Sequence, residues 1–153
     1  MPTARWSPAI RLQAEAGAFL RRWDNRNLPE EPKQTAPRFA EVKANVPLDA
    51  LYKTWHIYSR TDDRYYAADL ITDILGGGAS SRLYQQLVKE QQLFSNIECY
   101  HLGSTDAGLL TIEGKLVKGV KMEDAEAAVQ EELEKLQQEG VSQRELDKVK
   151  NKT

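Results

Sequence analysis

Residues 74–90 read ILGGGASSRLYQQLVKE, and the prediction of the fold is built outward from this stretch. Its three glycines, residues 76–78, should end a helix that begins at Asp62 or Asp63, because glycine is favoured just after a last helical turn. Ser80 is a suitable N-cap for a second helix, which should run to about residue 91. Each helix has an apolar stripe at helical spacing: Ala68, Ile71 and Leu75 in the first, and Leu83, Leu87 and Val88 in the second.

Alternating apolar and polar residues predict strands on both sides of this helix pair. Upstream, residues 39–46 form one predicted strand, which Pro47 ends, and residues 51–58 form another. Downstream, residues 96–102 and 107–117 are predicted to form a hairpin. In the second strand, one side carries Leu51, Trp55 and Ile57, and the other carries Tyr52, Thr54, His56 and Tyr58.

The C-terminal part of the sequence predicts two consecutive helices. Residues 122–139 have apolar residues every three or four positions, and Gly140 follows as the C-terminal cap residue. Residues 142–145 read SQRE, a capping box that begins another helix. The chain stops about ten residues later. We therefore expect the domain to be incomplete at this end, to expose apolar surface there, and to self-associate through it.

The predicted order is strand, strand, helix, helix, and this order is then repeated. Adjacent pairs of strands favour an α+β domain in which helices cover one face of an antiparallel or mixed sheet. Before it, residues 8–23 have a helical apolar stripe, and residues 28–37 contain three prolines. The sequence thus predicts a helix plus interdomain linker over residues 1–38 and the folded domain over residues 39–153.

The composition excludes several classes of protein. The 153 residues include 21 basic and 23 acidic side chains, for a formal net charge of −2, so no electrostatic footprint for nucleic acid is present. No apolar run approaches the roughly 20 residues that span a membrane. The single cysteine excludes an internal disulfide. The first residues contain no apolar targeting segment, and the sequence assigns no compartment.

The sequence contains few residues that bind metals. There are two histidines, and neither H-E-x-x-H nor H-x-x-E-H occurs. The nearest cluster is Glu98, Cys99 and His101, in which Cys99 and His101 share one face of a strand. Because a closed zinc site normally takes four ligands, we expect these two residues, and His56, to be structural.

The glycine stretch suggests two further kinds of chemistry. Ser80 and Ser81 follow glycines at a helix start, but the G-x-S-x-G spacing of a nucleophile elbow is absent, so a structural role is expected. A glycine turn before a helix N-terminus, with Arg82 in the first turn, would suit an anion. This anion site stays open as an alternative. The residues alone support no enzymatic activity.

The same stretch resembles the insulinase-type (pitrilysin, M16) zinc peptidase family, which carries a helix, a glycine turn, Ser-Ser-Arg-Leu and a Leu-Val-x-Glu run. Residues 47–58, 106–110 and 133–151 resemble other parts of that family in the same order. The resemblance covers residues 39–153 and implies the second, non-zinc-binding homologous domain. It implies structural roles, not catalytic, cofactor-binding or metal-binding ones, for the signature residues Gly76, Gly77, Gly78, Ser80, Ser81, Arg82, Leu83 and Tyr84.

The resemblance also implies a function. In the family an inverted zinc motif, H-x-x-E-H, performs catalysis in a separate domain, so zinc is expected in the catalytic domain of the parent protein and not in this chain. The present domain would enclose an unfolded peptide opposite that catalytic domain, which belongs to the same or a partner chain. The alternatives are a non-peptidase scaffold domain of the same fold and, third, the anion-binding domain.

Overall fold

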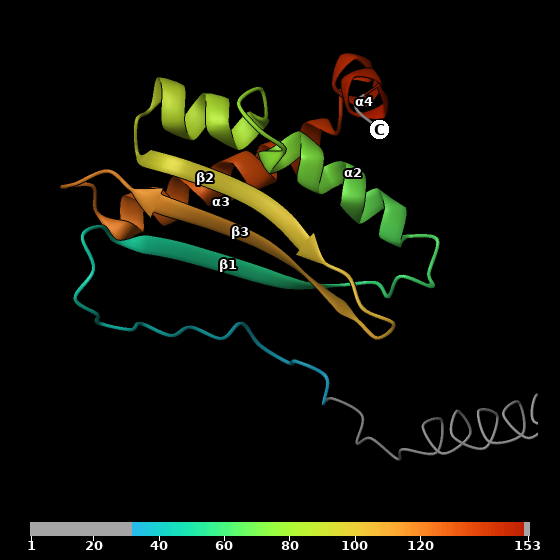
Figure 1. Ribbon diagram of the computed structural model, residues 1–153, viewed down its shortest axis with the longest axis horizontal. Helices are drawn as coiled ribbons and strands as arrows, with labels where there is room; N and C mark the ends of the chain where they lie inside the picture. Colours follow the sequence, from blue (N-terminus) through green and yellow to red (C-terminus); the bar gives the residue numbers. More distant parts are fainter. Residues whose placement is uncertain (1–31, 152–153) are drawn as a thin grey trace, which may run out of the picture. The chain divides into compact units, whose positions relative to one another are not determined.

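The computed structural model describes residues 32–151, so the helix predicted at residues 8–23 lies outside the described part of the chain. Residues 32–43 belong to one unit of the chain and are exposed coil. Residues from Ala44 onward form a second, compact unit (Figure 1). No helix among residues 32–151 is long and apolar enough to span a membrane.

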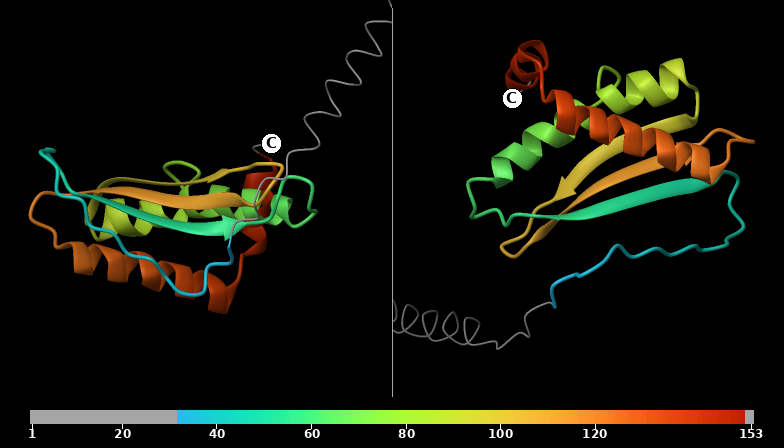
Figure 2. Two further views of the ribbon diagram at one scale, coloured as in Figure 1. Left: turned by 90° about the horizontal axis from the view of Figure 1, so that it is seen from below. Right: turned by 180° about the vertical axis from the view of Figure 1, so that it is seen from behind.

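The compact unit is an α+β domain, as predicted. Three antiparallel strands lie in the order β1-β3-β2, so the last strand in sequence is central. The helices lie on one face of this sheet, and α3 crosses that face (Figure 2). The elements in order are β1 (Ala50–Ile57), α2 (Tyr65–Gly76), the π-helix η1 (Tyr84–Glu90), β2 (Phe94–Leu102), β3 (Gly108–Leu116), α3 (Met122–Glu139) and α4 (Gln143–Lys150).

The core lies between the sheet and its helices. On β3, Ile112 and Leu116 are fully buried against the helical layer, whereas Glu113 and Lys115 point to the other face. Of the three apolar residues predicted for the helix after the turn, Leu83 and Leu87 are completely buried and Val88 is partly buried against the core. The other large side chains that are fully buried are Leu75, Phe94, Ile97 and Val129.

The strand predicted at residues 39–46 is wrong. These residues are coil, and Phe39 and Val42 are 84% and 85% exposed. An alternating pattern fixes which side chains share a face, but a strand also needs a backbone partner. In the described part of the chain, β1 pairs with β3 alone, so one strand and not two precedes α2.

The start of α2 differs slightly from the prediction. The helix begins at Tyr65, and its N-cap residue, Arg64, makes no side-chain cap. Asp62 instead accepts a hydrogen bond at 2.9 Å from the backbone N–H of Arg64 and binds its guanidinium. The carboxylate therefore organises the turn that precedes the helix.

Candidate functional site

The glycine turn joins α2 to η1, and its glycines meet different neighbours. Gly76 packs directly on β2, where a Cβ atom would overlap the backbone nitrogen and Cβ of Cys99. A Cβ on Gly77 would lie 2.5 Å from the carbonyl oxygen of Asp73. Gly78 has a φ of +108°, which side chains of L residues rarely adopt, and faces open space. The turn thus brings α2 close to the sheet and reverses the chain.

The helix after the turn begins later than predicted, and Ser80 is not its side-chain cap. Helical structure starts at Arg82 and continues as η1, for which no side chain supplies a cap. The backbone carbonyl of Ser81 accepts from Gln85 N–H at 3.0 Å. The Ser81 hydroxyl is buried and is the one such side-chain polar atom without a hydrogen-bond partner in the described residues. Neither serine lies beside a histidine that would activate it.

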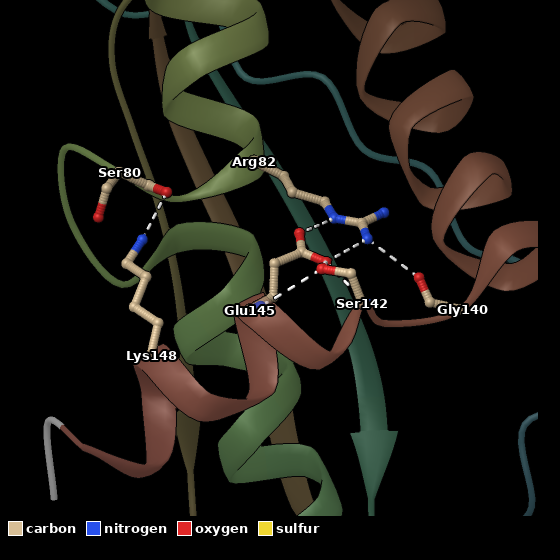
Figure 3. Close-up of polar contacts among 6 residues, drawn as sticks. All are labelled: Ser80, Arg82, Gly140, Ser142, Glu145 and Lys148. Carbon is tan, nitrogen blue, oxygen red and sulfur yellow. Dashed lines mark hydrogen bonds and ion pairs between the residues drawn. The ribbon is translucent and has the colours of Figure 1, made fainter.

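Arg82 extends away from its own turn and binds the first turn of α4 and the segment that precedes it (Figure 3). Its Nε donates to Oε1 of Glu145 at 2.5 Å, and its Nη2 donates to Oε2 of Glu145 at 2.8 Å. The same Nη2 donates to the carbonyl oxygen of Gly140 at 3.0 Å. We call these contacts of Arg82, together with the two interactions below, the clasp.

Two further interactions complete the clasp. Glu145 is the third residue of α4 and completes its capping box, and its Oε2 accepts from the backbone N–H and hydroxyl of Ser142 at 2.9 and 2.7 Å. Lys148 Nζ donates to the carbonyl oxygen of Ser80 at 2.8 Å (Figure 3). The clasp therefore fixes α4 against the glycine turn from two positions one turn apart on the helix.

The electrostatics of the clasp favour the charged forms of both partners. The side chains of Arg82 and Glu145 are only 19% and 28% exposed. The Arg82 hydrogen bond lowers the pKa of Glu145 to about 2, and Ser142 contributes in the same direction. The hydrogen bond to Glu145 likewise raises the pKa of Arg82. A bidentate arginine–carboxylate pair of this kind is strong and geometrically specific.

The clasp argues against the anion-binding alternative. Glu145 balances the charge of Arg82, so an anion at the turn would compete with a preformed pair. Three amide groups of the turn are also used: Gly77 N–H donates to Asp73, Gly78 N–H to Gly76, and Ser81 N–H to Gly78. These three amides are therefore not free to bind an anion.

Cys99 and His101 share the helix-facing side of β2, as predicted, but their surroundings do not fit a zinc site. Burial raises the pKa of the Cys99 thiol to about 12, which disfavours the thiolate that zinc binds. His101 Nδ1 lies 3.3 Å from the Thr72 hydroxyl, and its ring packs edge-on against Tyr65. Residues 32–151 contain no group of three or more His, Cys, Asp or Glu side chains arranged to hold a metal. His56 lies on the opposite face of the sheet.

The face of the sheet without helices carries a cluster that the sequence did not reveal. Glu113 on β3 accepts hydrogen bonds from the hydroxyl groups of Tyr52 on β1, at 3.1 Å, and Tyr100 on β2, at 3.3 Å. The hydrogen bond to Glu113 is the main cause of the raised pKa of Tyr52. The pKa of Tyr100 is also raised, mainly by burial and to a smaller extent by the charge of Glu113. Glu98 is the register partner of Glu113. Only the pairing of three separate strands brings these residues together.

The described domain has the α+β order and the glycine turn that the resemblance to the M16 family leads us to expect. The comparison with protein families agrees: the family described as the peptidase M16 inactive domain matches residues 9–153. The chain belongs to this family. A domain of this kind is not catalytic on its own.

Individual relatives point the same way. The chain is 31% identical over 88 residues to the uncharacterized zinc protease YmxG of Bacillus subtilis, covering 58% of this chain and 21% of the relative. It is 29% identical over 136 residues to the zinc protease PqqE of Helicobacter pylori, and the match covers 86% of this chain and 31% of that relative. The crystal structure of a peptidase M16 inactive domain from Pseudomonas fluorescens shares the fold, with a TM-score of 0.63 and 24% identity over 67% of this chain and 25% of that one.

The chain spans between a fifth and a third of the length of these curated relatives. It therefore matches one portion of a longer kind of protein.

Proposed function

We propose that this domain is the non-catalytic half of a zinc metallopeptidase. It encloses an unfolded peptide opposite a separate domain that carries the H-x-x-E-H motif, on the same or a partner chain. Zinc and the water that attacks the peptide belong to that other domain. The present domain contributes a surface that holds the substrate.

The observation that carries this proposal is membership of the inactive-domain family in a sequence that has no H-x-x-E-H motif. The names of the curated relatives, both zinc proteases, support the peptidase context. The sheet supports the enclosing role, because one of its faces has no helical cover and presents polar and aromatic side chains. An extended peptide can lie on such a face or pair with an edge strand.

Reconstitution tests the proposal. The chain is mixed with a separately produced M16 catalytic domain that bears the zinc motif, and hydrolysis of an unstructured, internally quenched peptide is followed. We expect no hydrolysis by the chain alone and a rise in kcat/KM when it joins the catalytic domain. A matched control uses the same chain with Glu145→Gln and Arg82→Met, in which the clasp is broken.

Two results would contradict the proposal. One is a kcat/KM of the catalytic domain that does not change at any concentration of the chain, with no complex formed by the two in sedimentation. Such a result would favour the scaffold alternative. The other is hydrolysis by the chain alone that survives chelation of metal.

A further inference from the structure

The helix-free face of the sheet, which we call the open face, has no layer packed on it within the described domain. Its middle consists of Tyr52, Glu98, Tyr100 and Glu113, contributed by all three strands. Tyr52 is 59% exposed. At one end of the same face lie Leu102 and Leu109, exposed by 58% and 37%, with His56 beside them. Contiguous aromatic and apolar exposure of this kind marks an interaction surface.

The charges on the open face are unbalanced. Glu98 and Glu113 occupy directly opposed positions in the β2–β3 register. Like charges directly opposite each other on a sheet destabilise it. The two hydroxyl donors on Glu113 orient its carboxylate but do not neutralise it. Glu98 accepts from the side-chain amide of Asn96, which is also neutral.

Several carboxylates elsewhere in the domain have a cation beside them, although others in residues 32–151, such as Glu90, form no ion pair. Asp62 pairs with Arg64, Glu126 with Lys53, Glu132 with Lys135, and Glu145 with Arg82. Neither Glu98 nor Glu113 forms an ion pair with any residue in the range 32–151, although Lys115 lies on the same face. The open face thus holds two adjacent carboxylates that lack a cation.

We infer that the open face binds an extended peptide segment through a cationic side chain, an arginine or lysine, seated between Glu98 and Glu113. The hydroxyl groups of Tyr52 and Tyr100 both donate to Glu113, so their rings lie near this position. Aromatic faces attract cations. A guanidinium would also supply several donors for the carboxylate oxygens. The inference rests on the proposed function and deepens it, since it names the chemistry of the substrate that the domain prefers.

The far end of the open face adds a second feature of the segment. Leu109 and Glu113 are four residues apart on β3, which corresponds to roughly 13 Å along a strand. A peptide running along the sheet with its cation at Glu113 would place a side chain about four residues away over Leu102 and Leu109. An apolar residue at that spacing is therefore favoured.

The test is an NMR titration of the ¹⁵N-labelled 153-residue chain with two short unstructured peptides. One contains a single central arginine, with leucine four residues away. The other is identical except that citrulline, which is neutral and similar in shape, replaces the arginine. We expect saturable amide shifts centred on the open face and about threefold to tenfold tighter binding of the arginine peptide. This preference should shrink as salt is raised from about 0.05 M to about 0.5 M.

Variants locate the cation. Glu113→Gln should remove most of the preference for arginine over citrulline, and Glu98→Gln should reduce it severalfold. Glu98→Gln has a second signature, because removing one of two opposed charges should raise the midpoint of thermal unfolding while it weakens arginine binding. Glu90→Gln is the matched control, because Glu90 is an exposed carboxylate at the end of η1, on the helical side of the domain. This change should alter neither the preference for arginine nor the midpoint of thermal unfolding.

The outcomes separate this inference from the proposed function. Equal affinity for both peptides, or equal effects of Glu113→Gln and Glu90→Gln, overturns the inference and leaves peptide enclosure standing. Absence of saturable arginine-peptide binding also overturns it. The proposed function itself is tested separately, by the gain in kcat/KM in the reconstitution described above and by the activity of the chain alone.

Discussion

Arg82 and Glu145 are 63 residues apart in the sequence, yet they form a bidentate, half-buried ion pair. The pair joins the helix after the glycine turn to the capping box of α4. Glu145 serves both structures at once, since its carboxylate accepts from Arg82 and from Ser142. We regard this pair as the structural purpose of the arginine in the Ser-Ser-Arg-Leu signature.

The first prediction is that the two residues are strongly coupled. In a double-mutant cycle of Arg82→Met and Glu145→Gln, we expect a coupling of about 1–3 kcal/mol in the free energy of unfolding, typical of hydrogen bonds between charged groups. Urea denaturation provides the measurement. The exposed neighbour Arg144, changed to Met, is the control and should cost less than about 0.5 kcal/mol. A coupling no larger than the effect of this control would show that the clasp is unimportant.

The second prediction concerns acid. The pKa of Glu145 is about 2 in the folded domain and ordinary, near 4.3, when unfolded. A lowered pKa means that its contribution to stability is complete above about pH 5 and is lost as the pH falls toward 2. The difference in unfolding free energy between the wild type and Glu145→Gln should therefore shrink over this window. A difference that stays constant from pH 6 to pH 3 would be inconsistent with the ion pair.

The third prediction contrasts two glycines of the turn. Gly76→Ala forces a Cβ into the backbone of Cys99 and should cost about 3 kcal/mol or more. Gly78→Ala meets open space and suffers only backbone strain, about 1–2 kcal/mol. Thermal or urea unfolding of both variants checks the order. If Gly78→Ala were the more damaging change, the packing of α2 on β2 described here would be wrong.

The fourth prediction concerns the cysteine. Cys99 is buried, and burial raises the pKa of its thiol to about 12, so little thiolate exists at pH 8. The native domain should react with a thiol-specific disulfide reagent far more slowly than the urea-unfolded chain. Rapid stoichiometric labelling of the native domain would mean that this part of β2 is open to solvent.

Most of the fold could be predicted because its elements have strong local periodicity. The alternation of β1 and β3 and the apolar stripe of α3 gave correct elements, and the capping box located the start of α4 at Gln143. Local sequence patterns gave wrong predictions where the structure depends on contacts with other parts of the chain. Residues 39–46 alternate but have no strand beside them in the described fold, and Ser80 lies in turn structure just before the helix that it was expected to cap.

The site was less accessible to sequence reasoning. The signature singled out Arg82, but its partner 63 residues away could not be read from the local pattern. The cluster on the open face was missed altogether. Tyr52, Tyr100 and Glu113 belong to three different strands, and only the β1-β3-β2 order and its register bring them together. The sequence pattern of one strand predicts which of its side chains share a face, but not which strands lie beside it.

The central claim, that this domain is the non-catalytic half of a peptidase, is tested most directly by zinc content and peptide hydrolysis in one purified, dialysed preparation. The account predicts a chain without stoichiometric zinc that does not cleave an unfolded peptide until a catalytic M16 domain is added. One tightly bound zinc per chain, together with cleavage in the absence of any partner, would contradict it.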